Sequence, residues 1–144
     1  MKLLSPVFNQ DEFIPAKYTC EGQDINPPLL IKDIPSLTES LSLIVDDPDA
    51  PAGTWVHWVV FNIPLISEIK ENSVPGKSGI NTINEKKYHG PCPPSGVHRY
   101  FFKLYALDVI LDLKEGASKG ALEKAMQGHV ITETELVGLY TKNK

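Results

Sequence analysis

The fold is most clearly indicated by residues 41–63, which read LSLIVDDPDAPAGTWVHWVVFNI. Two apolar runs rich in β-branched and aromatic residues, 41–46 and 56–63, flank a segment that contains Pro48 and Pro51. Such runs are typical of β-strands, and the prolines stiffen the loop between them. The second run is apolar at positions that face both sides of a strand, so we expect it to lie centrally in a sheet. The stretch therefore predicts a β-hairpin inside a larger sheet.

The rest of the chain also predicts strands, with one exception. Residues 99–107 form a third strong candidate, and 3–8, 29–31 and 130–140 form weaker ones. The exception is 117–128, where apolar residues recur at helical spacing between Ser118, a favoured N-cap type, and Gly128, a stop signal. This pattern predicts a mainly β protein, a β-sandwich with one or two short helices. No linker divides residues 1–144, so we expect a single domain.

Composition narrows the class of partner and the compartment. The formal net charge is −4 and no cluster of Lys and Arg occurs, which argues against nucleic acid as a partner. No run approaches the roughly 18 apolar residues of a transmembrane helix, and Pro6 interrupts the only segment that could resemble a signal peptide. Two cysteines, Cys20 and Cys92, are too few for a secreted disulfide scaffold. We therefore expect a cytoplasmic protein with reduced thiols and without stable membrane insertion.

Polar residues gather where the predicted strands meet proline-rich loops. Asp47 ends the first strand of the hairpin and His57 begins the second, so both lie at one end of the sheet. His98 and Tyr100 lie two residues apart at the start of the third strand and therefore share a face. If that strand is adjacent and starts at the same end, the four residues converge. Two imidazoles and a hydroxyl then suit a small anion, with Asp47 orienting an imidazole.

Each of these positions also has a structural interpretation. Asp47 and Asp49 are common turn formers, and His57 could be a core histidine bonded to a backbone carbonyl. We interpret His89 and His129 as structural or exposed.

Two other chemistries compete with anion binding. The histidines, aspartates and Cys92 could hold a metal, but no typical metal-ligand spacing or calcium loop occurs, so we expect no metal site. Cys92 near His98 could be a nucleophile with its base, although no known thiol-enzyme signature is present. An acid–base or thiol enzyme that uses His57, His98 and Cys92 is therefore the alternative to a binding protein.

Three motifs in order carry a family resemblance: DPDAP at 47–51, WVHW at 55–58 and GPCPPSGVHRY at 90–100. Segments 14–22, 26–29 and 113–120 add to it, so that it spans nearly the whole chain. The sequence resembles the phosphatidylethanolamine-binding protein family, in particular its shorter bacterial and archaeal branch, often called Raf-kinase-inhibitor-like.

The resemblance implies a Greek-key antiparallel β-sandwich with a pocket for phosphate-like groups. The pocket residues that it implies are Asp47, His57, Tyr88, Gly90, Pro94, His98 and Tyr100, with Asp49 and Pro51 as loop support. It also implies a cis peptide at Ala50–Pro51, a homodimer, and possible kinase or protease partners. The sequence ends at Lys144, without the C-terminal helical segment that covers the pocket in eukaryotic members, so we expect a pocket more open than theirs.

Taken together, these observations predict a protein that binds a small phosphoryl or carboxylate anion without a cofactor and without catalysis. Tyr88 would add a second hydroxyl, and Gly90 would let the backbone approach closely. We expect binding of an anion such as sulfate to strengthen as pH falls from about 8 to 6, because both His57 and His98 would gain charge.

Overall fold

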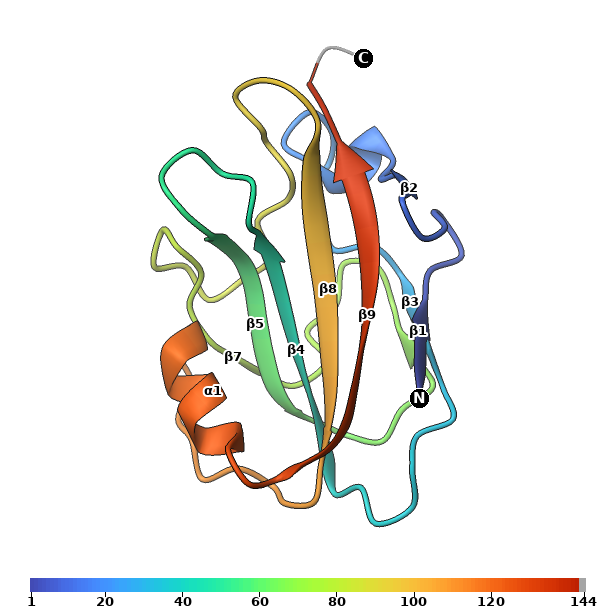
Figure 1. Ribbon diagram of the computed structural model, residues 1–144, viewed down its shortest axis with the longest axis vertical. Helices are drawn as coiled ribbons and strands as arrows, with labels where there is room; N and C mark the ends of the chain where they lie inside the picture. The colour runs from blue at the N-terminus through green and yellow to red at the C-terminus, as the bar shows by residue number, and fades with distance from the viewer. Residues whose placement is uncertain (143–144) are drawn as a thin grey trace.

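The computed structural model describes residues 1–142 and contains two β-sheets that pack face to face (Figure 1). The larger sheet has the strand order β2-β9-β8-β4-β5-β7 and the smaller one the order β1-β3-β6. The elements of the larger sheet are β2 (Glu12–Phe13), β4 (Ser40–Asp47), β5 (Trp55–Ile63), β7 (Lys77–Ser78), β8 (His98–Leu107) and β9 (Val130–Tyr140). The remaining elements are β1 (Lys2–Leu4), β3 (Leu29–Lys32), β6 (Glu68–Ile69), the 3₁₀ turn η1 (Ala16–Tyr18) and the helix α1 (Lys119–Met126).

The order of strands in the larger sheet confirms the predicted mainly β Greek-key sandwich. β4, β5 and β7 lie side by side, and β8 returns to pair with the free edge of β4. This spatial order, with the fourth strand beside the first, defines a Greek key. One pair departs from the expected antiparallel arrangement, because β2 runs parallel to β9.

The predicted hairpin is present and is central, as the apolar pattern of its second strand indicated. β4 pairs with β5 on one side and with β8 on the other, and both pairs are antiparallel. Asp47 lies opposite Trp55, and Asp46 lies opposite Phe101. The C-terminal end of β4 therefore lies next to the N-terminal ends of β5 and β8, at one end of the sheet.

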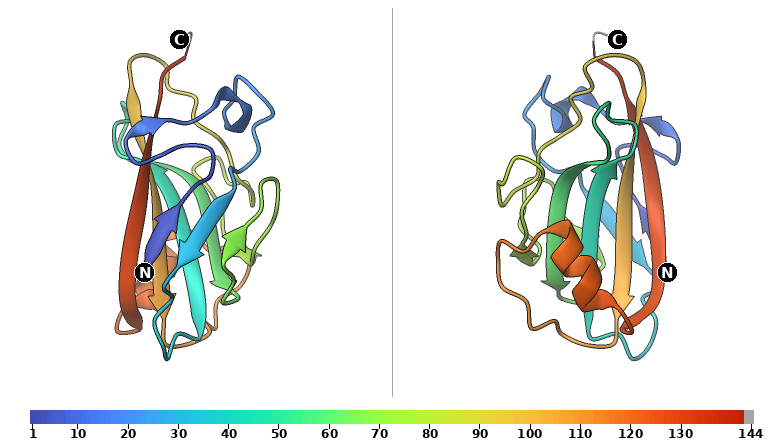
Figure 2. Two further views of the ribbon diagram at one scale, coloured as in Figure 1. Left: turned by 90° about the vertical axis from the view of Figure 1, so that its right-hand side faces the viewer. Right: turned by 60° about the vertical axis from the view of Figure 1, so that its left-hand side comes forward.

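Two apolar cores hold the layers together. The larger core fills the space between the sheets and joins residues such as Leu29 and Ile31 of β3 to Leu43 and Val60 of the central hairpin. The smaller core lies on the opposite face of the large sheet, where α1 covers β5 (Figure 2). Because buried apolar area is the main stabilising contribution, these two cores fix the frame on which the loops are carried.

Helix α1 confirms the one helical segment that the sequence indicates. Ser118 is its N-cap, and the Ser118 hydroxyl accepts a hydrogen bond from the Ala121 backbone N–H at 3.1 Å. Gly128 follows the helix with a φ of 81°, a conformation that glycine adopts without steric cost. Within residues 1–142, no helix is both long and apolar enough to span a bilayer.

Candidate anion-binding site

A cavity of about 290 Å³ opens at the end of the large sheet where β4, β5 and β8 meet. The loops 48–54 and 88–97 lie at this same end, at the top of the view in Figure 1. The cavity is lined by Asp47, Ala50, Pro51, Trp55, His57, His89, Cys92, Pro93, Pro94, His98 and Tyr100. Five of the seven predicted ligand-binding residues are among them: Asp47, His57, Pro94, His98 and Tyr100. The predicted convergence of three strand ends is therefore present.

His98 and Asp47 form a buried pair at this end of the sheet. The His98 Nδ1 lies 2.7 Å from Asp47 Oδ2, so the ring donates a proton to the carboxylate through this nitrogen. The other oxygen, Asp47 Oδ1, accepts the Asp49 backbone N–H at 2.7 Å. Asp47 therefore orients an imidazole, as predicted, and leaves the Nε2 edge of His98 for a ligand.

Asp49 supports the loop from outside the cavity. Its carboxylate accepts the Arg99 side chain in a two-pronged contact, at 2.9 and 2.8 Å, and also accepts the Arg99 backbone N–H at 2.9 Å. The hydrogen bond from the Arg99 guanidinium is the largest cause that lowers the pKa of Asp49 to about 2. Arg99 of β8 is therefore paired with Asp49, and this contact holds the 48–54 loop against the start of β8.

His57 is the extra residue of a β-bulge. The register of β4 and β5 places Val45 opposite Trp58 and Asp46 opposite Val56, which leaves His57 without an opposite residue. A bulge turns the side chain at this position out of the regular alternation of the strand. The 88–97 loop takes the place of a partner strand here, because His57 Nδ1 lies 2.6 Å from His89 O and the His89 N–H donates to His57 O at 3.0 Å.

Burial determines the charge of His57. The residue is only 4% exposed, and this burial is the main cause that lowers its pKa from 6.5 to about 4. The contact with His89 O and the charges of Asp47 and Asp46 raise the pKa but do not offset burial. The expectation that both imidazoles become charged between about pH 8 and 6 is therefore wrong for His57, which stays neutral.

Tyr100 contributes a neutral hydroxyl. Its ring lies edge-on to His57, with centroids 5.2 Å apart, and the residue is 1% exposed. Burial, followed by the negative charges of Asp47 and Asp49, raises the pKa of Tyr100 above its ordinary value. The hydroxyl therefore stays protonated near neutral pH and can act as a hydrogen-bond donor.

Tyr88 and Gly90 do not line the cavity, in contrast to what the resemblance implies. The Tyr88 hydroxyl donates to the Tyr18 carbonyl at 2.7 Å, and its ring packs edge-on against Trp58. Gly90 donates its N–H to Asp24 at 2.7 Å, and a Cβ at this position would lie 2.4 Å from the Tyr18 oxygen. Gly90 does allow a close backbone approach, but to the segment around η1 rather than to a ligand.

Of the cavity residues that were not predicted as ligand-binding or supporting residues, His89 and Trp55 contact His57. His89, interpreted as structural or exposed, supplies the carbonyl that holds His57 and also lines the cavity with its ring. Trp55 packs against both His57 and His89, with centroid distances of 4.5 and 5.3 Å. The sequence signals for them are that Trp55 is the first residue of the WVHW motif and that His89 lies in the proline-rich 88–97 loop.

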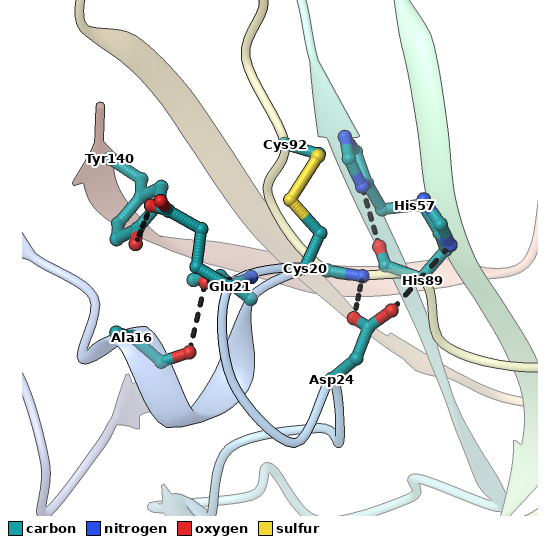
Figure 3. The surroundings of a disulfide bond; sticks show 10 residues. Ala16, Cys20, Glu21, Asp24, His57, His89, Cys92 and Tyr140 are labelled. Carbon is teal, nitrogen blue, oxygen red and sulfur yellow. Dashed lines mark hydrogen bonds and ion pairs between the residues drawn. A yellow bond between two sulfur atoms is a disulfide. The ribbon is translucent and has the colours of Figure 1, made fainter. Parts of the chain in front are cut away.

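A disulfide joins Cys20 to Cys92 (Figure 3), and Cys92 lines the cavity. The prediction of two reduced thiols is therefore wrong. The alternative of a thiol enzyme also fails, because a sulfur bonded to another sulfur is not a free thiolate nucleophile. The cytoplasmic prediction loses one of its supports, since disulfides are uncommon in that compartment, and it stays a prediction.

The expected cis peptide at Ala50–Pro51 is also absent. All peptide bonds of the described residues are trans. Pro51 still lines the cavity, as do Ala50 and Pro94. Within residues 1–142, no group of three or more His, Cys, Asp or Glu side chains is placed to hold a metal ion.

Comparison with known proteins places this geometry in a family. The sequence profile described as phosphatidylethanolamine-binding protein matches residues 4–141. A UPF0098 protein of Methanothermobacter thermautotrophicus is 50% identical, with 99% of each chain covered, and one of Pyrococcus horikoshii is 54% identical over 96% of this chain and 76% of that protein.

Solved structures agree with the sequence comparisons. The crystal structure of a PEBP homologue from Chlamydia trachomatis superposes with a TM-score of 0.95 at 44% identity, covering 98% of this chain and 97% of that one. Escherichia coli YbcL, described as a member of the mammalian PEBP family, superposes with a TM-score of 0.89 at 25% identity, covering 97% of each chain. The chain therefore belongs to the phosphatidylethanolamine-binding protein family.

Proposed function

We propose that this protein binds a small anion, a phosphoryl or carboxylate group, in the cavity between His57 and His98 and does not catalyse a reaction there. The observation that carries the proposal is the buried His98–Asp47 pair, which lines the cavity together with Tyr100. An imidazolium held by Asp47 can donate a charge-assisted hydrogen bond from Nε2, and Tyr100 can donate a second hydrogen bond.

The walls of the cavity support binding of a compact group. Trp55, Pro51 and Pro94 contribute apolar surface to its lining. Hydrogen bonds and charges act more strongly where such surface displaces water. The stiff proline loops also reduce the conformational entropy lost when a ligand is held.

The same geometry argues for a binding protein rather than an enzyme. Both carboxylate oxygens of Asp47 already accept hydrogen bonds, one from His98 and one from the Asp49 backbone. His57, the other candidate general base, has a pKa lowered to about 4, which makes it a weak proton acceptor at neutral pH. Regulation through a kinase or protease partner, and assembly as a homodimer, stay predictions from the family resemblance.

The test uses calorimetry with inorganic phosphate and a His98→Asn variant. Asparagine can still donate an N–H toward Asp47 but lacks the charged edge that would face the anion. We expect phosphate affinity to fall about tenfold or more, the usual effect of losing a charged hydrogen bond. His129→Ala is the matched control, because His129 pairs with Asp108 at the opposite end of the sheet, and it should bind phosphate as the wild type does.

Two outcomes would overturn the proposal. Equal phosphate affinity in the wild type and His98→Asn would remove the anion site from this cavity. Turnover of a chromogenic phosphate monoester or acetate ester that is lost in His98→Asn would replace binding with catalysis. Binding without turnover supports the proposal.

A further inference from the structure

The two ring nitrogens of His57 have different roles. Nδ1 lies 2.6 Å from the His89 carbonyl oxygen, and a carbonyl oxygen can only accept a hydrogen bond (Figure 3). Nδ1 must therefore carry a proton. A neutral imidazole carries only one proton, so Nε2 of a neutral His57 presents a lone pair.

The surroundings keep His57 neutral and hold its ring in this orientation. The charged and titratable groups that act on it are Asp47, Asp46 and His89, and burial outweighs the two carboxylates. Trp55 packs on one side of the ring at 4.5 Å and Tyr100 meets it edge-on at 5.2 Å. Turning the ring over would leave the His89 carbonyl without its donor, so the observed tautomer is stabilised by geometry as well as by burial.

The lone pair of His57 belongs to the same cavity as the donors. Nε2 of His57 has no hydrogen-bond partner within residues 1–142, and the side chain is part of the cavity lining. Tyr100 lines the cavity with a hydroxyl that can donate, and His98 can donate from Nε2 when its ring is an imidazolium held by Asp47. The cavity therefore presents a fixed acceptor beside donors, which is not the all-donor arrangement that suits a fully deprotonated anion.

Building on the function proposed above, we infer that the ligand is an oxyanion that still carries a proton, namely hydrogen phosphate or the protonated form of a phosphate monoester. Its P–OH donates to His57 Nε2, and its unprotonated oxygens accept from His98 and Tyr100. Sulfate and phosphate diesters have no such proton near neutral pH. They would place an oxygen lone pair against the lone pair of Nε2, and a site built to bind a hydroxyl strongly disfavours an analogue that lacks it.

The inference is tested by calorimetry with four probes at about pH 6, where a phosphate monoester is still partly protonated. The probes are inorganic phosphate, monomethyl phosphate, dimethyl phosphate and sulfate. Sulfate matches phosphate in shape, and dimethyl phosphate matches dihydrogen phosphate in charge. We expect the two proton-bearing anions to bind about tenfold or more tightly than the other two. If monomethyl phosphate binds as well as phosphate, a larger phosphomonoester can be the natural ligand, whereas binding of phosphate alone points to free phosphate.

His57→Asn is the matched variant. Asparagine can keep the N–H that donates to the His89 carbonyl but removes the Nε2 acceptor. We expect the preference for phosphate over sulfate to fall to about twofold or less, mainly through weaker phosphate binding. The tautomer can be measured without any variant, because nitrogen chemical shifts of the wild type distinguish an Nδ1–H imidazole from an Nε2–H imidazole or an imidazolium.

The outcomes separate this inference from the proposed function. Equal affinity for phosphate and sulfate, with both weakened in His98→Asn, would leave the anion site standing and overturn the selectivity. An Nε2–H tautomer or an imidazolium at about pH 6 would overturn it as well. Failure of all four probes to bind would overturn both the selectivity and the anion site. If His57→Asn does not fold, the four-probe comparison and the tautomer measurement on the wild type still test the selectivity.

Discussion

Asp47 shows how one residue can satisfy both a structural and a functional interpretation. Its Oδ1 accepts the Asp49 backbone N–H and so shapes the turn after β4, while its Oδ2 holds His98. Asp46, its neighbour, faces the opposite side of the sheet, where its Oδ2 pairs with Lys103 and Lys119. The two adjacent carboxylates thus make their contacts on opposite faces of the sheet, because successive side chains of a strand point in opposite directions.

His57 should make folding sensitive to acid. Its pKa is about 4 in the folded protein and 6.5 when the ring is exposed, so the unfolded chain binds more protons between these pH values. The stability that depends on a neutral His57 is complete above about pH 6.5 and is lost as pH falls toward 4. The shift corresponds to about 3 kcal/mol, as an order of magnitude.

The His57→Asn variant tests this dependence. It cannot titrate in this range, so its free energy of unfolding should fall less than that of the wild type between about pH 7 and 4. Urea denaturation at several pH values measures the difference between the two proteins. If the free energies of unfolding of the wild type and His57→Asn differ by the same amount at every pH in this range, His57 is charged or exposed in the folded state.

Helix α1 acts as a cover for the outer face of the large sheet. Leu122 is fully buried there and belongs to a cluster with Ile44, Val59 and Phe61. We expect Leu122→Ala to lower the free energy of unfolding by about 2–5 kcal/mol, because it removes a buried side chain and leaves a cavity. The measurement is urea denaturation at neutral pH.

The same variant distinguishes stability from binding. The cavity proposed to bind phosphate is lined by loop residues and by strand residues such as Tyr100, which belongs to the other core. Phosphate affinity of folded Leu122→Ala should therefore match that of the wild type. A large loss of phosphate affinity at a temperature where the variant is folded would mean that the two faces of the sheet are coupled.

The disulfide links two loops that are far apart in the sequence. Cys20 and Cys92 are separated by 72 residues, and non-covalent contacts reinforce the junction, including the Cys20 N–H donating to the Pro91 carbonyl at 3.1 Å. The bond therefore restricts the whole unfolded chain between η1 and β8, and it attaches the η1 segment to the wall of the cavity.

Removing both cysteines should destabilise the whole molecule. For a closed loop of this length, the chain-entropy model gives about 4 kcal/mol for Cys20→Ala/Cys92→Ala. Urea denaturation of the oxidised wild type and of the double variant measures the loss in free energy of unfolding. The wild type in the presence of a reducing agent should lose a similar amount. Equal stability of the oxidised and double-variant proteins, or two titratable thiols in the untreated protein, would contradict the disulfide.

Local patterns in the sequence were sufficient for the long strands, the helix and the strand ends at which polar residues gather, but not for the two-residue strands β2, β6 and β7. Alternation and β-branched residues identified β4, β5 and β8, and Ser118 and Gly128 bounded α1, because these preferences act over a few neighbouring residues. The motifs around Asp47, His57 and His98 also indicated the family and most of the cavity.

Contacts between distant segments were decided only by the tertiary structure. The pairing of β8 with β4 brings His98 to Asp47, and the approach of the 88–97 loop gives His57 a carbonyl instead of a strand partner. The bulge at His57 follows from the register, and the Cys20–Cys92 bond follows from the packing of η1. The charge of His57 depends on burial by all of these parts together. No local pattern encodes that burial, which is why an expected cation is a neutral acceptor in the folded protein.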